Sequence, residues 1–392
     1  MAKNALLGRA KAAKNDEFYT QYKDIQNEIN AYVEYNPDVF RGKTILLPCD
    51  DPEWSNFTKF FAQNFEFFGL KKLISTSYAI ESKNYKTDWQ PTLFETENPR
   101  FKADKTRVCG KIFTLDHDTN ASGRIDIDDL EWDYLDGDGD FRSAEVTALR
   151  DEADIIITNP PFSLFREFLA WILETPKKFL VIGNINAVTY KEVFPLLKEN
   201  QIWMGSSYFN GGAAYFVGSK EFYDPKMMSN EKHAYIKDDK LYWRVNGVRW
   251  FTNLDHGRRH QPMRLMTMAD NLEFSKKMKG QKEYYHYDNY DAIEVPFTEL
   301  IPKDYSGIMG VPISFLDKYC PEQFEIIGMC ENEDLYGLKT CKYSSLECKQ
   351  AYKNKFGKAG TYDLNASGVI LVNGIQEKVY QRILIRHKNP QS

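Results

Sequence analysis

The hydrophobic pattern of the first 205 residues alternates between short apolar runs and longer segments with apolar residues every three or four positions. Short apolar or β-branched runs indicate buried strands, and the longer periodicity indicates helices that lay one face on a sheet. The predicted strands are 44–47, 73–77, 155–158, 179–183 and 202–205. The predicted helices are 24–35, 53–68, 144–150, 165–173 and 190–200. This alternation predicts an α/β domain with a parallel sheet covered on both faces.

The pattern changes after about residue 210. The segment Leu241–Phe251 predicts a β-hairpin on the turn Asn246-Gly247. The C-terminal hundred residues are of mixed α and β character and contain a lysine-rich run, Lys339–Lys358. We therefore expect a catalytic domain over residues 1–245 and a second region over 246–392.

Composition sets the broad class of the protein. Hydrophobic residues make up 42% and charged residues 27% of the chain, as in ordinary soluble globular proteins. No apolar run approaches membrane-spanning length, and the six cysteines include no C-x-x-C pair, which favours reduced thiols in the cytoplasm and no membrane partner. The net charge is −5, but residues 115–154 carry −11, so the remainder carries +6 and can still hold a phosphate backbone.

The stretch Asn159-Pro160-Pro161-Phe162 carries the most specific chemical signal. It follows the apolar strand 155–158 directly, at the strand end where open α/β sheets bind ligands. The Asn159 side-chain oxygen and the Pro160 carbonyl can both accept hydrogen bonds from one amino group, and Phe162 offers a stacking face. This pattern is typical of enzymes that methylate exocyclic amino or amide nitrogens, so these four residues are the predicted catalytic residues. A purely structural interpretation is an extended turn with Phe162 in the core.

Further motifs are distributed along nearly the whole chain. They are N-D-E-F-Y-T at 15–20, P-C-D-D-P-E-W-S-N-F at 48–57, G-D-G-D-F-R-S at 137–143, N-P-P-F-S-L-F-R-E-F at 159–168, Trp250–Leu254, Met309–Tyr319 and Pro321–Ile326. In this order they resemble the EcoRI-type family of adenine-specific DNA methyltransferases, and the block 309–326 is specific to that family.

The resemblance implies a Rossmann-like class I methyltransferase sheet with an α+β target-recognition region. It also implies methyl transfer from S-adenosylmethionine to N6 of an adenine that is flipped out of duplex DNA. Its implied cofactor contacts are a methionine-binding motif, a loop after the first strand, an adenine-binding pair and the catalytic asparagine. These are Phe18, Tyr19 and Thr20; Pro48, Cys49, Asp50 and Asp51; Asp140 and Phe141; and Asn159.

The cofactor loop Pro48–Pro52 departs from the usual glycine-rich pattern because it contains no glycine. Asp51 and Ser55 are both candidate caps for the helix that follows it. The altered loop favours a different interpretation, a DNA-binding protein with a degenerate methyltransferase fold. Methylation of RNA or of a protein glutamine is also compatible with the sequence, because enzymes of both kinds use the same Asn-Pro-Pro motif.

A basic and aromatic span, Arg249–Lys282, has the composition of a DNA-facing surface, although a solvated charged face explains it equally well. The candidate DNA-binding residues are Arg249, Phe251, Arg258, Arg259 and Arg264. Phe251 is the candidate for a second ring against the flipped base. The expected partners are duplex DNA and, in a genetic sense, a restriction endonuclease; the expected state is a monomer.

The acidic segment Asp118–Asp129 approaches the spacing of an EF-hand calcium loop. It departs from that pattern with serine at position five and aspartate at position twelve. The preceding residues 111–115 also predict a strand rather than a helix. The sequence therefore favours an acidic surface insertion and no resident metal.

Overall fold

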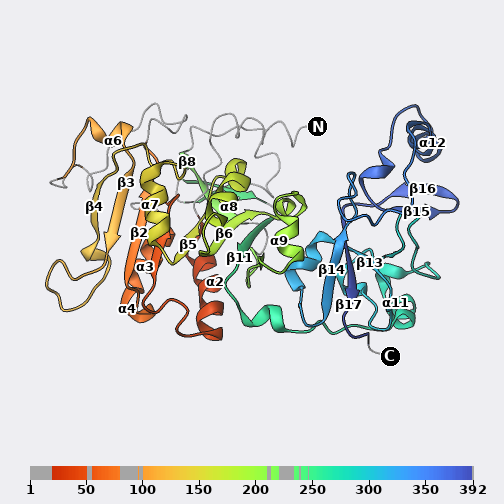
Figure 1. The fold of residues 1–392 in the computed structure, drawn as a ribbon, viewed down its shortest axis with the longest axis horizontal. Helices are drawn as coiled ribbons and strands as arrows, with labels where there is room; N and C mark the ends of the chain where they lie inside the picture. The colour runs from red at the N-terminus through yellow and green to blue at the C-terminus, as the bar shows by residue number, and fades with distance from the viewer. Residues whose placement is uncertain are drawn as a thin grey trace. The chain divides into compact units, whose positions relative to one another are not determined.

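The computed structural model describes residues 20–50, 55–79, 96, 100–209, 213–219, 234–237, 240–245 and 247–390. The chain divides into two compact units (Figure 1). Unit 1 comprises Met1–Val193 and Ile202–Gly257, and unit 2 comprises Phe194–Gln201 and Arg258–Ser392. None of the helices in the described ranges has the length and apolar character needed to cross a bilayer.

Unit 1 contains an eight-stranded sheet in the order β4-β3-β2-β1-β5-β6-β11-β7. Its strands in chain order are β1 Thr44–Leu47, β2 Lys72–Ser77, β3 Lys111–Leu115, β4 Glu131–Tyr134, β5 Ile155–Thr158, β6 Lys178–Asn184, β7 Trp203–Met204 and β11 Val248–Thr252. The pairs β1–β2, β1–β5 and β5–β6 are parallel, whereas β3 and β11 run against their neighbours. This is a mostly one-directional, Rossmann-like sheet, as predicted. We call the edge at which β1, β2, β5 and β6 end the carboxyl edge.

The helices of unit 1 lie before, between and after these strands. They are α2 Tyr22–Tyr35, α3 Asn56–Gln63, α4 Phe65–Phe68, α6 Lys105–Val108, α7 Ala144–Glu152 and α8 Phe165–Leu173. Side chains from α2, α3 and α4 share one buried cluster with alternate residues of β1 and β5, for example Ile45 and Ile157. On α8, Phe165 packs on Phe251 of β11 and crowds Gly183 of β6, so helices cover both faces of the sheet.

Several element predictions need correction. The predicted helix 53–68 is broken at Asn64 in its described part, and 190–200 contains only α9, Phe194–Lys198. Residues 111–115 form the predicted strand as β3, and the short helix α6 before it was not predicted. Strand β4 was not predicted because its four residues are mostly exposed or half-buried and lie in an acidic segment.

The hairpin predicted for Leu241–Phe251 is wrong. Strand β10, Lys240–Val245, pairs with β8, Ala213–Ser219, and β9, Ala234–Lys237, in a separate three-stranded sheet. Strand β11 instead enters the main sheet between β6 and β7. The positive φ of +80° at Gly247 therefore redirects the chain from one sheet to another. The expected boundary at residue 245 falls before a strand of the main sheet, and unit 1 continues to Gly257.

Unit 2 is built on a four-stranded sheet in the order β12-β13-β17-β14 and on the two-stranded sheet β15–β16. The strands are β12 Ile293–Glu294, β13 Met309–Pro312, β14 Phe324–Met329, β15 Val369–Val372, β16 Ile375–Lys378 and β17 Arg382–His387. Its helices are α9, α11 Met268–Phe274 and α12 Ser345–Phe356. This mixed architecture agrees with the α+β character that the sequence predicts.

Candidate active site

Strand β5 delivers the Asn-Pro-Pro-Phe motif to the carboxyl edge. Its four residues are buried between β1 and β6, and Asn159, which follows them, is 8% exposed. Both prolines are buried, and Pro161 has the extended angles φ −54° and ψ 125°. Phe162 is half-buried and packs against the core of unit 1. The motif is therefore held rigidly at the end of a central strand.

Asp50, in the loop after β1, joins this strand end to the start of α3. Its Oδ2 accepts a hydrogen bond from the Thr158 hydroxyl at 2.6 Å, and its Oδ1 accepts one from the Ser55 hydroxyl at 2.7 Å. Ser55 in turn accepts the N–H of Phe57 and is the N-cap of α3, which confirms one of the two predicted caps. A buried carboxylate is stabilised by such donors, and here they fix the position of Asn159 relative to the cofactor loop.

The same loop is also tied to strand β2 on its other side. The Ser75 hydroxyl donates to the Asp50 carbonyl at 2.9 Å, and the Thr76 hydroxyl donates to the Pro48 carbonyl at 3.1 Å. The backbone N–H of Asp50 donates to the Thr76 carbonyl at 3.1 Å. Hydroxyl and carboxylate groups thus shape a loop in which glycine is usually found. Cys49 is half-buried, and Asp51 lies outside the described residues.

Thr20 is the described residue of the N-terminal motif; Phe18 and Tyr19 lie outside the described ranges. Thr20 is buried, and its carbonyl accepts a hydrogen bond from the Asn56 side chain at 2.7 Å. Asn56 is the first residue of α3, directly after the cap that binds Asp50. The structure therefore brings the end of this motif to the cofactor loop.

Asp140 reaches the carboxyl edge by a close backbone approach. Gly139 has φ +81°, and a Cβ there would lie 2.2 Å from the Ser77 carbonyl at the end of β2. The Asp140 carboxylate binds the Arg142 guanidinium at 2.9 and 2.6 Å, and these bonds raise the pKa of Arg142. Burial raises the pKa of Tyr78, and the nearby Cys49 and Asp140 raise it further. Cys49, Tyr78 and Asp140 therefore lie in one neighbourhood.

Phe141 does not present a stacking face in this structure. It is fully buried, with edge-on contacts to Phe168 at 5.0 Å and Trp171 at 5.5 Å, both on α8. In this conformation Phe141 packs the Asp140 loop against α8, the helix after the Asn-Pro-Pro-Phe motif, and its ring is not open to an adenine.

Comparison with known proteins decides the family. The family model described as adenine-specific methyltransferase EcoRI matches residues 6–388. The chain belongs to this family.

Three curated relatives of this methyltransferase are named type II methyltransferases. It is 41% identical over 334 residues to Type II methyltransferase M.EcoRI of Escherichia coli, which covers 85% of this chain and 91% of that protein. It is 37% identical to Type II methyltransferase M.MpnI of Mycoplasma pneumoniae, over 86% of this chain and 90% of the relative. A third relative, M.MgeORF184P of Mycoplasma genitalium, is 34% identical over 97% and 98% of the two chains. The search of solved structures gives no significant match.

The candidate DNA-binding residues of the methyltransferase are divided between the two units. Arg249, at the start of β11, is half-buried with its guanidinium 5.7 Å from the Tyr208 ring centroid. In unit 2, Arg264 is exposed and Arg258 half-exposed, whereas Arg259 is 8% exposed and donates to the Asn200 side chain at 2.5 Å.

Phe251 is fully buried in the main sheet against Phe165. A side chain with no exposed surface in the sheet interior cannot face DNA in this conformation. The expectation that Phe251 stacks on the flipped base is therefore corrected.

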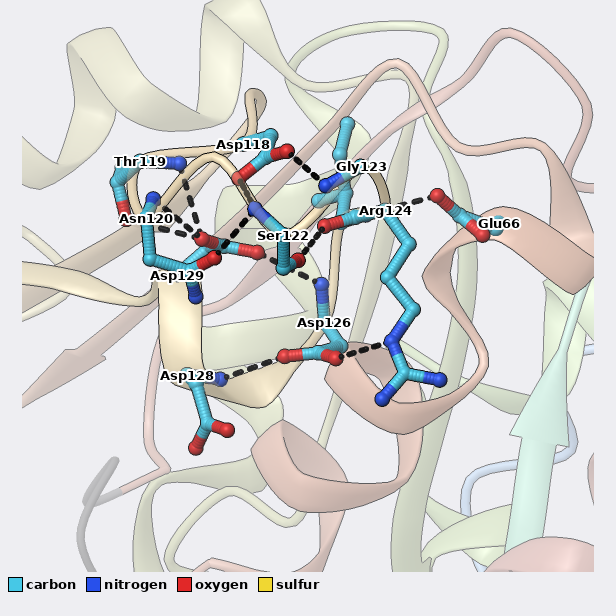
Figure 2. Close-up of polar contacts among 11 residues, drawn as sticks. Glu66, Asp118, Thr119, Asn120, Ser122, Gly123, Arg124, Asp126, Asp128 and Asp129 are labelled. Carbon is cyan, nitrogen blue, oxygen red and sulfur yellow. Dashed lines mark hydrogen bonds and ion pairs between the residues drawn. The ribbon is translucent and has the colours of Figure 1, made fainter.

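The acidic segment forms a loop whose backbone N–H groups donate to the carboxylates of Asp118 and Asp129 (Figure 2). Asp129 Oδ1 accepts the N–H of Thr119 at 2.9 Å and of Asn120 at 3.2 Å, and Oδ2 accepts the N–H of Asp126 at 3.0 Å. Asp118 accepts the N–H groups of Ser122 and Gly123. In the described chain, no group of three or more His, Cys, Asp or Glu is arranged to hold a metal ion. In this conformation the carboxylates of Asp118 and Asp129 bind backbone N–H groups of their own loop.

Sequence reasoning missed the hydroxyl residues that hold the site together. Ser75 and Thr76 lie in the last half of β2, and Thr158 ends β5. Both strands were predicted, so polar side chains near consecutive strand ends were an available signal. It also missed Glu28 of α2, which is fully buried and accepts the N–H groups of Ser206 at 2.8 Å and Ser207 at 2.6 Å. Burial raises the pKa of Glu28.

Proposed function

We propose that this methyltransferase transfers the methyl group of S-adenosylmethionine to N6 of an adenine within a specific sequence of duplex DNA. The observation that carries the proposal is the position of Asn159–Phe162 at the carboxyl edge, tied through Thr158 to Asp50 of the cofactor loop. Family membership gives the class of reaction. The names of the relatives, type II methyltransferases, support a role in a restriction-modification system.

The residues at the carboxyl edge fit the proposed cofactor. Asp140 places a carboxylate, the acceptor that an adenine amino group needs, beside the end of β2; Oδ1 accepts the backbone N–H and Nε of Arg142, and Oδ2 accepts its Nη2. Cys49 of the first loop and Asp140 each lie near Tyr78, which supports a nucleoside site between the first loop and the proposed adenine-binding residue. We assign Asp50 to positioning the cofactor loop rather than to contacting the cofactor, because both of its carboxylate oxygens accept hydrogen bonds from hydroxyl groups of the protein. When bound, S-adenosylmethionine supplies a methyl group on a positively charged sulfur.

The chain's own groups then orient the adenine. A paired adenine has N6 inside the duplex, so the base must first be flipped out. The Asn159 oxygen and the Pro160 carbonyl accept hydrogen bonds from the N6 amino group and turn its lone pair towards the methyl group. Phe162 stacks on the base. Fixed acceptors and orientation supply the rate enhancement, because the reaction needs no covalent enzyme intermediate.

Replacing Asn159 with alanine tests this mechanism. Asn159→Ala should lower turnover by about two orders of magnitude or more, because it removes one fixed acceptor of the amino group. S-adenosylmethionine binding, measured by calorimetry, should be largely kept. Asn159→Asp is the matched control, since it retains an acceptor oxygen and should retain more turnover than the alanine variant.

The assay should offer radiolabelled S-adenosylmethionine with duplex DNA, RNA and protein substrates in parallel. Labelling of duplex DNA at adenine N6 supports the proposal, whereas labelling of RNA or of glutamine side chains contradicts it. Near-normal turnover of Asn159→Ala would refute the assigned role. Mapping modified adenines in DNA from cells that express the protein identifies the recognition sequence. The proposed acting form is a monomer.

A further inference from the structure

Helix α12 of unit 2 has an outward face that no function above explains. The helix spans Ser345–Phe356 and lies beside β15 and β16 (Figure 1). Its inward side is packed: Cys348 and Ala351 are buried with Leu364 and Val369 in a small core. The helix is also capped at both ends, by the Ser344–Glu347 capping box and by Gly357 with φ +66°. These features fix the helix firmly, so its outward side chains have defined directions.

The outward face consists of long side chains that can donate or accept hydrogen bonds, with one leucine. Positions i, i+3, i+4, i+7 and i+8 lie on one side of a helix. The residues at these positions are all exposed: Leu346, Lys349, Gln350, Lys353 and Asn354. Leu346 is 76% exposed. This composition differs from the inward side, where every buried side chain of the helix is small.

The lysines of the outward face differ from the other lysine of the helix in their partners. Lys355, which turns towards β16, binds Glu377 at 2.8 Å and lies over the Tyr362 ring. In the part of the chain that the structure describes, Lys349 and Lys353 form no ion pair. The sole acid of the helix, Glu347, accepts the N–H and hydroxyl of Ser344, which lower its pKa. The outward face therefore carries positive charge that no acidic side chain among the described residues pairs with.

Gln350 and Asn354 form an ordered amide pair between these lysines. The Gln350 Nε2 group donates to Asn354 Oδ1 at 2.7 Å. This bond leaves the Gln350 oxygen as an acceptor and the Asn354 amino group as a donor. Side-chain amides of this kind read the donor and acceptor pattern of an adenine edge in the major groove. Leu346 on the same face suits the methyl group of a thymine.

We propose that α12 is a DNA-reading helix of this methyltransferase, with Lys349 and Lys353 on phosphates and Gln350 and Asn354 on base edges. The inference rests on the proposed function, which supplies duplex DNA as the polyanion that complements the face. A helix of 12 residues is about 18 Å long, and the major groove, about 12 Å wide, admits an α-helix. The face thus combines the charge, length and hydrogen-bonding groups of a groove-binding element.

The first arm of the test measures the affinity for duplex DNA and its dependence on salt, which reports contacts to phosphates. The full-length protein is titrated with fluorescent duplex DNA that contains the mapped recognition sequence, over a series of salt concentrations. Lys349→Ala/Lys353→Ala should lower affinity by about tenfold or more and reduce the slope of log K against log salt by about two. Lys349→Arg/Lys353→Arg should restore both. The control is Lys71→Ala, an exposed lysine just before β2, at the end of that strand opposite the carboxyl edge.

The second arm measures sequence discrimination. Gln350→Ala/Asn354→Ala should keep the salt slope but reduce the ratio of kcat/KM between the recognition sequence and single-base variants by about tenfold. Lysine variants that behave like Lys71→Ala, or amide variants with unchanged discrimination, would overturn the inference while wild-type methylation of DNA still stands. A wild-type protein that neither binds nor methylates duplex DNA would overturn the proposed function and this inference together.

Discussion

Two charged segments of the molecule differ in whether their charged side chains have partners within the described protein. In the loop Asp118–Asp129 of unit 1, the carboxylates of Asp118 and Asp129 accept hydrogen bonds from the loop's own backbone. On α12 of unit 2, Lys349 and Lys353 have no acidic partner within the described residues. The loop resembles a ligand site in sequence, yet its hydrogen-bonding capacity is used internally. A run of charge therefore indicates a partner only when the fold leaves its capacity unused.

Of the substitutions that test this comparison, the one at Asp129 should have the largest effect on stability. It is 1% exposed and accepts four hydrogen bonds, from Thr119 N–H and hydroxyl, Asn120 N–H and Asp126 N–H. Asp129→Asn replaces one acceptor oxygen with a donor and should clearly lower the urea midpoint of unfolding. It should also increase the rate of proteolytic cleavage within residues 116–130.

Asp128→Asn is the matched control for that variant. Asp128 is exposed, and its carboxylate has no hydrogen-bond partner among the described residues, so the urea midpoint should stay at the wild-type value. If Asp129→Asn were as stable and as protease-resistant as Asp128→Asn, the claim that internal hydrogen bonds to Asp129 stabilise the loop would be wrong.

A smaller and gradual loss should appear at acid pH. The Asp126 N–H, with the Thr119 and Asn120 groups, lowers the pKa of Asp129 below its ordinary value near 3.8. A lowered pKa in the folded state contributes stability that is fully present above the ordinary pKa and is lost as pH falls through the lowered one. The difference in urea midpoint between wild type and Asp129→Asn should therefore be constant near neutral pH and shrink below about pH 4. A difference unchanged at pH 3 contradicts the assignment.

The smallest effect should come from the cap of α12. Ser344→Ala removes the acceptor for the Glu347 N–H and should destabilise the helix by about 1 kcal/mol. Both the melting temperature and the affinity for duplex DNA should fall slightly, because a frayed helix holds its outward face less well. Ser345→Ala, one residue later, is the control and should change neither property. The lysine variants should differ from both: they should lose DNA affinity at an unchanged melting temperature.

Sequence predicts the centre of unit 1 well and its periphery poorly. Strands β1 and β5 have the predicted bounds because fully buried apolar runs, ended by proline or polar residues, specify their own state locally. Helix α8 has them because its buried residues recur at helical spacing. The hairpin at Asn246-Gly247 failed because Val248–Thr252 pairs with β6, more than sixty residues away, rather than with β10. The Asn-Gly pair predicts that the chain turns, but it does not predict which strand the next segment pairs with, because that choice depends on distant residues.

The candidate site shows the same division. The motif at Asn159–Phe162 and the cap at Ser55 could be predicted, since each depends on neighbouring residues. The bond between Thr158 and Asp50 joins residues that are 108 positions apart, and no local pattern contains it. Burial of Phe141 and Phe251 likewise depends on helix α8, which covers them in three dimensions.

The discontinuous path of the chain limits how this protein can diversify. Residues 194–201 leave unit 1, join unit 2 and return, so the chain passes between the units three times. Phe194 packs on Tyr336, and Asn200 accepts a hydrogen bond from Arg259. A chimera joined only at residue 258 would combine residues 194–201 of one parent with the Tyr336 and Arg259 positions of the other. Exchange of unit 2 between relatives therefore requires that residues 194–201 and 258–392 be exchanged together. A single crossover would leave side chains of two different parents packed in the same unit.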